Sequence, residues 1–148
     1  MKLGIVAALC VGASALAAGC APKIGDSCSN SADCSVDGER VCDVAQPGGY
    51  CTIAGCDPDS CPDGALCVEW RFMPARTSAT WCMEDCRKDG DCRQKAGYRC
   101  VHQGPSGTVV YDGETILDPT DAPVLARITD IERRDDKGFC AAVVTSEK

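Results

Sequence analysis

The chain has 148 residues, a length that allows one domain, and it contains 14 cysteines but only 5% aromatic residues. Its formal net charge of −7 excludes the basic surface that nucleic-acid-binding proteins need, so we expect no nucleic-acid partner. Few large apolar side chains and many cysteines are typical of small exported domains that disulfide bonds hold together.

The N-terminus has the layout of an export signal. Lys2 supplies a positive charge, residues 3–18 are uncharged and mostly apolar, and small residues lead up to Cys20. This order predicts a signal peptide over 1–19 that is removed on export. The alternatives are a secretory signal without a lipid and a helix that stays in the membrane.

Ala17-Ala18-Gly19-Cys20 resembles the lipobox of bacterial lipoproteins. The resemblance implies cleavage between Gly19 and Cys20, a covalent lipid on the Cys20 thiol, and a membrane as the first partner of the mature chain. Ala21 follows the cysteine where an aspartate is the family's inner-membrane signal, so the resemblance implies the outer membrane. Residues 20–27 form a lipid-anchored tether with a reach of roughly 25 Å. We therefore expect a cell-envelope location.

The remaining cysteines repeat in a pattern. Without Cys10, which lies in the signal, and Cys20, twelve cysteines are left, and an even number in an oxidising compartment predicts six disulfides. Their spacing divides the cysteine-rich domain, residues 28–148, into a first unit (28–55), a second unit (56–85) and a third unit (86–148). An aromatic residue precedes the fourth cysteine of every unit, and an aspartate precedes the second cysteine of two units: Tyr50, Trp81 and Phe139; Asp33 and Asp91. We interpret the units as three copies of one design.

Four cysteines in a unit allow three connectivities, and spacing alone does not decide between them. We favour bonds from first to third and from second to fourth, because this order crosses two loops and lets the aromatic residue pack on the bridge. The predicted pairs are Cys28 with Cys42, Cys34 with Cys51, Cys56 with Cys67, Cys61 with Cys82, Cys86 with Cys100, and Cys92 with Cys140. The predicted fold is small and disulfide-rich, with three tandem four-cysteine units of loops and short β-hairpins and little helix outside the signal peptide.

Two segments show a resemblance to known cysteine-rich modules. The Cys-x4-Asp-Cys run within 28–51 and again within 86–100 resembles Dickkopf- and colipase-type modules, and Gly97-Tyr98-x-Cys100 resembles the last turn of EGF-like modules. The adjacent cysteine pair of the former and the Cys-x-Cys of the latter are missing here. The resemblance implies a small disulfide-rich fold and no particular function.

Two patterns suggest metal sites. The run Asp57-Pro-Asp59-Ser-Cys61-Pro-Asp63-Gly64 gathers carboxylates, which suit calcium, but Cys61 takes a ligand position of an EF-hand and the closing Glu69 comes one residue early. We interpret the run as turns. Zinc sites use cysteines two to four residues apart, and Cys82-x3-Cys86 has that spacing. We expect disulfides there, no metal, and no cofactor besides the lipid on Cys20.

The third unit contains an inserted segment, 101–139. Two β-rich tetrads flank Asp112-Gly113, which predicts a hairpin. Residues 124–134 fit either a helical face or a strand that turns back into 139–144, and we favour the strand. Long insertions often hold functional residues, and a merely tolerated insertion is the equal alternative.

The sequence offers little support for catalysis. His102 is the one histidine, and no G-x-S-x-G turn occurs, so we expect no enzyme. Bridged loops held near a membrane favour a binding or interaction module with an envelope or extracellular protein partner. The alternatives are a passive structural component of the envelope and an inhibitor of secreted proteases, for which Arg71–Arg76 is the candidate loop.

Overall fold

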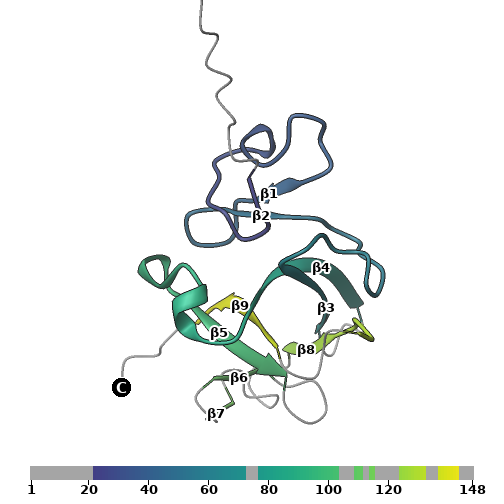
Figure 1. Ribbon diagram of the computed structural model, residues 1–148, viewed down its shortest axis with the longest axis vertical. Coiled ribbons are helices and arrows are strands. Elements are labelled where there is room, and N and C mark those ends of the chain that lie inside the picture. Colours follow the sequence, from purple (N-terminus) through teal and green to yellow (C-terminus); the bar gives the residue numbers. More distant parts are fainter. Residues whose placement is uncertain are drawn as a thin grey trace, which may run out of the picture.

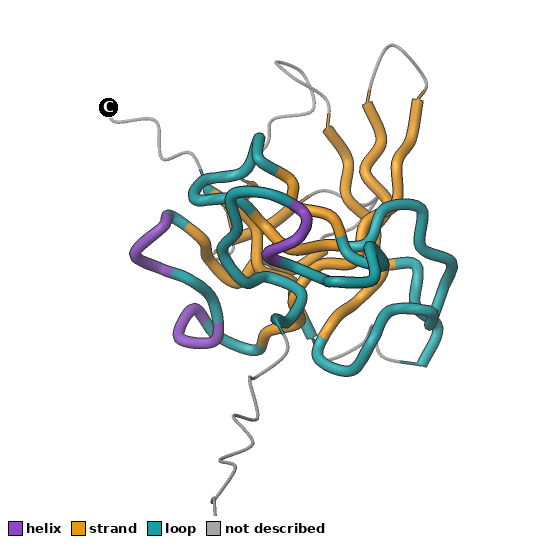
Figure 2. The backbone as a smooth tube through the Cα atoms, turned by 90° about the horizontal axis from the view of Figure 1, so that it is seen from above, coloured by secondary structure: helices purple, strands orange, loops and turns teal. Residues whose placement is uncertain are grey.

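The computed structural model describes residues 22–72, 77–103, 109–111, 114–115, 124–132 and 137–143. The predicted signal peptide, its cleavage site after Gly19 and the predicted lipid site at Cys20 lie outside the described residues. The described part consists of nine strands, three short 3-10 helices and loops, without an α-helix (Figure 2). This is the small, disulfide-rich, strand-dominated fold that the cysteine pattern predicts.

The first unit folds around a two-stranded sheet. Strand β1 (Val41–Asp43) pairs antiparallel with β2 (Tyr50–Thr52), and the 3-10 helix η1 (Ser31–Asp33) precedes them. Gly49 has a φ of +66°, and a Cβ atom there would lie 1.9 Å from the carbonyl oxygen of Cys28. Only glycine fits this turn. In Figure 1 the unit lies above the larger sheet, and the Thr52 side chain of β2 reaches β4 with a hydrogen bond to Cys82.

The second and third units share one seven-stranded antiparallel sheet with the order β7-β6-β5-β9-β4-β3-β8. Its strands are β3 (Ala65–Phe72), β4 (Thr77–Cys86), β5 (Tyr98–Gln103), β6 (Val109–Tyr111), β7 (Glu114–Thr115), β8 (Val124–Ile128) and β9 (Gly138–Ala142). Two 3-10 helices, η2 (Asp89–Asp91) and η3 (Gln94–Ala96), lie in the connection from β4 to β5.

This sheet curls around a small core. Strand β8, at one end of the order, comes back toward β5, where Gln103 Oε1 accepts a hydrogen bond of 2.6 Å from the Ile128 N–H (Figure 1). Val68, Val101 and Phe139 are fully buried, and Ile128 is 1% exposed. The core is therefore built from few side chains, which is the condition under which disulfides add necessary stability.

In the inserted segment, the predicted hairpin and the favoured strand are confirmed, whereas the predicted partner of that strand is wrong. Val110 lies opposite Thr115 in the β6–β7 hairpin, as predicted, although the turn residues Asp112-Gly113 lie outside the described residues. Residues 124–128 form a strand rather than a helix. The predicted return of this strand into 139–144 is wrong, because β8 pairs with β3 and β9 lies between β5 and β4. An apolar pattern identifies a strand but not its partner.

All three units have the same disulfide geometry. In each, the third and fourth cysteines lie directly opposite each other on neighbouring antiparallel strands: Cys42 and Cys51, Cys67 and Cys82, Cys100 and Cys140. These opposed cysteines are not bonded to each other, since the third bonds to the first and the fourth to the second. The six bonds are Cys28–Cys42, Cys34–Cys51, Cys56–Cys67, Cys61–Cys82, Cys86–Cys100 and Cys92–Cys140, the pairs expected from the sequence.

The aromatic residue before the fourth cysteine has a different role from the expected one. Successive side chains of a strand point to opposite faces, so Tyr50, Trp81 and Phe139 point away from the bridge that the next residue forms. Tyr50 contacts the ring of Tyr98 with a centroid separation of 5.4 Å, and Phe139 meets Trp70 edge-on at 5.7 Å. Tyr50 and Phe139 therefore contact rings of other units instead of covering their own disulfide.

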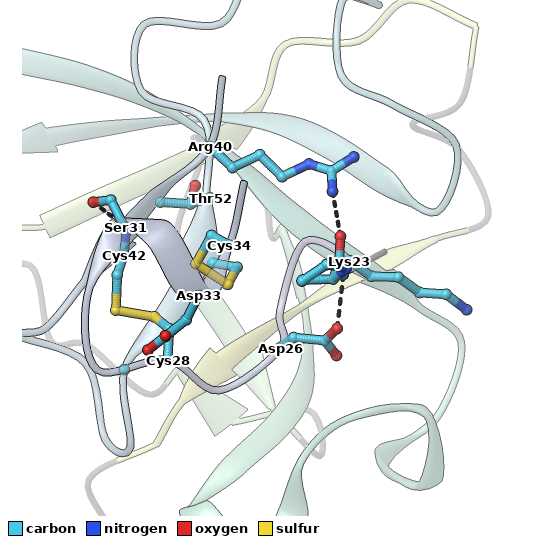
Figure 3. The surroundings of a disulfide bond; sticks show 12 residues. Lys23, Asp26, Cys28, Ser31, Asp33, Cys34, Arg40, Cys42 and Thr52 are labelled. Carbon is cyan, nitrogen blue, oxygen red and sulfur yellow. Dashed lines mark hydrogen bonds between the residues drawn. A yellow bond between two sulfur atoms is a disulfide. The ribbon is translucent and has the colours of Figure 1, made fainter. Parts of the chain in front are cut away.

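A polar residue before the second cysteine closes the first loop of each unit. Asp33 Oδ2 accepts hydrogen bonds from the two N–H groups that follow the first cysteine, at 2.7 and 3.1 Å, and Asp91 Oδ2 accepts the equivalent pair at 2.9 and 3.2 Å. In the second unit, whose loop is one residue shorter, Ser60 Oγ accepts from the N–H that follows the first cysteine at 3.0 Å. Figure 3 shows Asp33 beside the Cys28–Cys42 bond. The repeated aspartate thus has a physical cause in the loop geometry.

Candidate functional site

The acidic run of the second unit does not gather around one point. The Asp59 carboxylate accepts hydrogen bonds from the two N–H groups that follow Asp130, at 3.1 and 3.3 Å, and the Asp59 N–H donates to the buried Asp130 carboxylate at 2.8 Å. Glu69 pairs with Arg71 at 3.2 Å and with Arg127 at 2.7 Å. These acids connect the second unit to the inserted segment.

The other candidate residues from the sequence lie apart from one another. Both cysteines of Cys82-x3-Cys86 are in disulfides. Within the described ranges, groups of three potential metal ligands with ligand atoms less than 4.8 Å apart consist of half-cystines. His102 is exposed, with its Nε2 atom 4.0 Å from Cys100 Sγ. Only residues 71 and 72 of the candidate inhibitory loop are described, as the end of β3, because residues 73–76 lie outside the described residues.

A cavity of about 380 Å³ lies where the three units meet. The first unit contributes β1, β2 and the turn between them, the second contributes β3 and β4, and the third contributes β9. We call it the three-unit cavity, and its lining residues are Asp43, Gln46, Tyr50, Thr52, Trp70, Trp81, Met83, Ala141 and Ala142.

Strand register places two indole rings in this cavity. Val68 lies opposite Trp81 on β3 and β4, and Trp70 is two residues further along β3, so all three side chains leave the sheet on the same face. Val68 is completely buried, whereas Trp70 and Trp81 are only partly buried. The edge contact with Phe139 holds Trp70 against the core. The apolar face of the sheet therefore ends in two tryptophans that remain accessible.

Hydrogen bonds from two side chains fix the first unit over the sheet. The Thr52 hydroxyl donates to the carbonyl of Cys82 at 2.8 Å, and the Tyr50 hydroxyl accepts from the N–H of Glu84 at 2.8 Å. Burial raises the pKa of Tyr50 well above its ordinary value, so this hydroxyl stays protonated at neutral pH. The part of the first unit that covers the cavity is thereby attached to β4 at Cys82 and Glu84.

Arg93 fixes the first unit from the side of the third unit. Its guanidinium carbon lies 4.4 Å from the ring centroid of Tyr98 and 5.7 Å from that of Tyr50, and its Nη2 donates to the carbonyl of Gly49 at 2.7 Å. The Tyr98 hydroxyl donates to the carbonyl of Pro47 at 3.2 Å. Side chains of the first and third units therefore hold the cavity in one shape.

A second cavity, of about 560 Å³, is lined largely by charged residues of both signs. The Lys137 ammonium forms an ion pair with the Asp85 carboxylate there. Burial and then the negative charge of Asp26 raise the pKa of Glu84, another lining residue, to about 7. Lys23 also lines this cavity. Its charges are largely matched within the protein, which distinguishes it from the three-unit cavity.

The sequence did not predict the three-unit cavity, because its lining comes from distant strands and from no linear motif. The one local signal was the alternation of Leu66, Val68 and Trp70 on one strand with Trp81 and Met83 on the next. That period of two indicates a buried face, and the tryptophans mark its end. Which unit covers them depends on tertiary contacts such as that of Arg93.

Within the described ranges, no helix is long and apolar enough to cross a membrane. Six disulfides in a small fold are consistent with an exported protein. No protein-family model matches the chain, and neither the curated proteins nor the solved structures contain a match to it.

Proposed function

We propose that this protein is a lipid-anchored binding module of the cell envelope, located at the outer membrane, whose ligand occupies the three-unit cavity. The lipobox-like Ala17-Ala18-Gly19-Cys20 supports the anchor. The partly exposed Trp70 and Trp81 carry the binding proposal, since large aromatic side chains lining a concave apolar site with a few polar groups are typical of ligand sites.

The position of the first unit supports a site near the membrane. Ile24 is buried, and the Gly25 N–H donates to the carbonyl of Cys51 at 2.9 Å, so the chain is fixed to β2 five residues after Cys20. That stretch spans roughly 17 Å when fully extended. A lipid on Cys20 therefore holds the cavity within a short distance of the membrane surface.

The anchor is tested by labelled-palmitate incorporation in the native host. We expect label in the wild-type chain and in Cys10→Ala, and none in Cys20→Ala. Cys10→Ala is the matched control because it removes a cysteine of the predicted signal peptide without touching the lipobox. Equal labelling of Cys20→Ala and wild type would falsify the anchor.

The binding site is tested by placing a photoreactive amino acid at position 46, in the lining of the cavity, and irradiating intact envelopes. Mass spectrometry then identifies the adduct, whether it is a small molecule, a lipid or a protein. We expect one specific adduct at position 46, loss of it when Trp81→Leu is added, and none when the photoreactive residue replaces Val36, which is 97% exposed. Repeated absence of an adduct at position 46, together with loss of envelope integrity on gene deletion, would identify a passive structural component instead.

A further inference from the structure

We infer that the three-unit cavity binds a quaternary ammonium group. The inference rests on the proposed function, since it names the ligand chemistry of the same cavity. Its first basis is the lining: the partly buried Trp70 and Trp81 both line one cavity, beside the buried Tyr50. The face of an aromatic ring carries negative electrostatic potential, and tryptophan attracts cations most strongly.

The second basis is charge. Asp43 is the one charged side chain among the described residues that line the cavity. Its Oδ1 atom accepts a hydrogen bond of 3.0 Å from the Ala45 N–H, which holds the carboxylate in place at the end of β1. The whole chain also has a net charge of −7. A positively charged ligand therefore gains from Asp43 at short range and from the whole protein at long range.

The third basis separates a quaternary ammonium from a primary one. A primary ammonium has three N–H donors that each need an acceptor when water is removed. Met83, Ala141, Ala142 and the tryptophan rings form apolar walls, and the lining side chains with acceptor oxygens, Asp43, Gln46, Tyr50 and Thr52, all come from the first unit. Methyl groups on nitrogen remove the need for acceptors and gain contact with these walls.

The chain uses the same interaction beside the cavity. The Arg93 guanidinium lies 5.7 Å from the centroid of the Tyr50 ring, although Arg93 itself does not line the cavity. Because the positive charge of Arg93 repels a cationic ligand, such a ligand needs the negative charge of the Asp43 carboxylate to offset that repulsion. A volume of about 380 Å³ accommodates a choline-sized molecule and falls within the range of small-molecule sites.

The test compares choline with its neutral carbon isostere, 3,3-dimethylbutan-1-ol, on the mature lipidated protein in a non-ionic detergent, with the disulfides oxidised. Tryptophan fluorescence and calorimetry report binding. We expect choline to bind about tenfold more tightly than the isostere, and Asp43→Asn to lose most of that difference. Asp37→Asn, an exposed aspartate outside the cavity, is the matched control and should bind choline like wild type.

The outcomes separate this inference from the proposed function. Equal or tighter binding of the neutral isostere, or no binding of choline by a folded wild-type protein, overturns the cation inference. The proposed function stands in either case if the adduct at position 46 is still found, and falls if it is not. Phosphatidylcholine vesicles, with phosphatidylglycerol vesicles as control, distinguish the two sources of the ligand group: recruitment to the former indicates a lipid headgroup, and binding of free choline alone indicates a small molecule.

Discussion

The guanidinium carbon of Arg93 lies 4.4 Å from the ring centroid of Tyr98. The same guanidinium donates to the carbonyl of Gly49, so one side chain of the third unit contacts a ring of its own unit and the backbone of the first. The first unit has only a two-stranded sheet of its own, and such a sheet is marginally stable alone. Its position over the cavity therefore depends on contacts of this kind.

Arg93→Lys should lower the free energy of unfolding by about 2 kcal/mol, because lysine keeps the charge but loses the planar stack and the oriented donor. Guanidinium chloride unfolding without reductant measures this. Lys95→Ala, at an exposed position of η3, is the control and should stay within about 0.5 kcal/mol of wild type. An Arg93→Lys protein as stable as wild type would show that the contact adds nothing.

Gly49→Ala and Gly55→Ala separate steric overlap from backbone strain. Both glycines have positive φ, +66° and +74°, but a Cβ at Gly55 meets nothing within 4 Å. Gly55→Ala should therefore cost about 1–2 kcal/mol, the cost of the left-handed conformation alone. Gly49→Ala adds overlap with the Cys28 carbonyl and should cost more, with part of the Cys28–Cys42 bond mispaired on disulfide mapping. Equal stability of the two variants would contradict the role assigned to Gly49.

The loss of stability on removing a disulfide should increase with the size of the ring that the disulfide closes. The Cys28–Cys42 bond spans 14 residues and the Cys92–Cys140 bond spans 48. Chain entropy predicts losses of about 3 and about 4 kcal/mol for the paired Cys→Ala variants, respectively. Cys140 is also fully buried, so its truncation leaves a void and increases the second loss. Thermal unfolding of the two double variants tests this order, and a larger loss for the shorter ring would contradict it.

Acid should weaken the two loops that Asp33 and Asp91 close. Hydrogen bonds from backbone N–H groups hold the pKa of each carboxyl below its ordinary value of 3.8. A lowered folded pKa contributes stability above the unfolded pKa, and this stability is lost as pH falls through the folded pKa. The double variant Asp33→Asn/Asp91→Asn should therefore show a shallower fall in Tm between about pH 4 and pH 2 than wild type or Asp37→Asn. Parallel curves for all three proteins would rule out this contribution.

Glu84 should act in the opposite direction. Burial first, and then the charge of Asp26, raise its pKa to about 7, so the folded protein favours the protonated side chain. The associated stability is fully present below the ordinary pKa of 4.5 and is lost as pH rises through about 7. Glu84→Gln cannot ionise, so its Tm advantage over wild type should grow between about pH 4 and pH 8. A constant difference across that range would show that Glu84 titrates alike in both states.

The repeated cysteine pattern made much of the fold predictable from the sequence. The spacing of the cysteines divided them into three units, and the favoured order of first to third and second to fourth cysteine matches the six bonds. Asp33 and Asp91 were recognisable only as a repeated feature, although each accepts its hydrogen bonds from residues close in the chain. The pairing of β8 with β3 had no such signal, since Val68 and Ile128 meet across two units. The three-unit cavity could not be predicted either, because its lining residues also come from different units.

The aromatic residue before the fourth cysteine of each unit gives a second example of what the sequence could not predict. Tyr50, Trp81 and Phe139 were recognisable as a repeated feature, yet the face to which each points follows from strand geometry that only the pairing reveals. Arg93, the residue before η3 in the third unit, contacts Tyr50 and Tyr98, and nothing in its neighbourhood in the sequence indicates a partner in the first unit.

The opposed third and fourth cysteines have a consequence for how such a chain diversifies. Separate disulfides hold the third and fourth cysteines of each unit, and these cysteines lie opposite each other in all three units although the connecting stretches 43–50, 68–81 and 101–139 differ widely in length. Lengthening one closed loop adds little entropic cost. We therefore expect residues inserted between these two cysteines to change the surface of a unit while its paired strand ends stay in place.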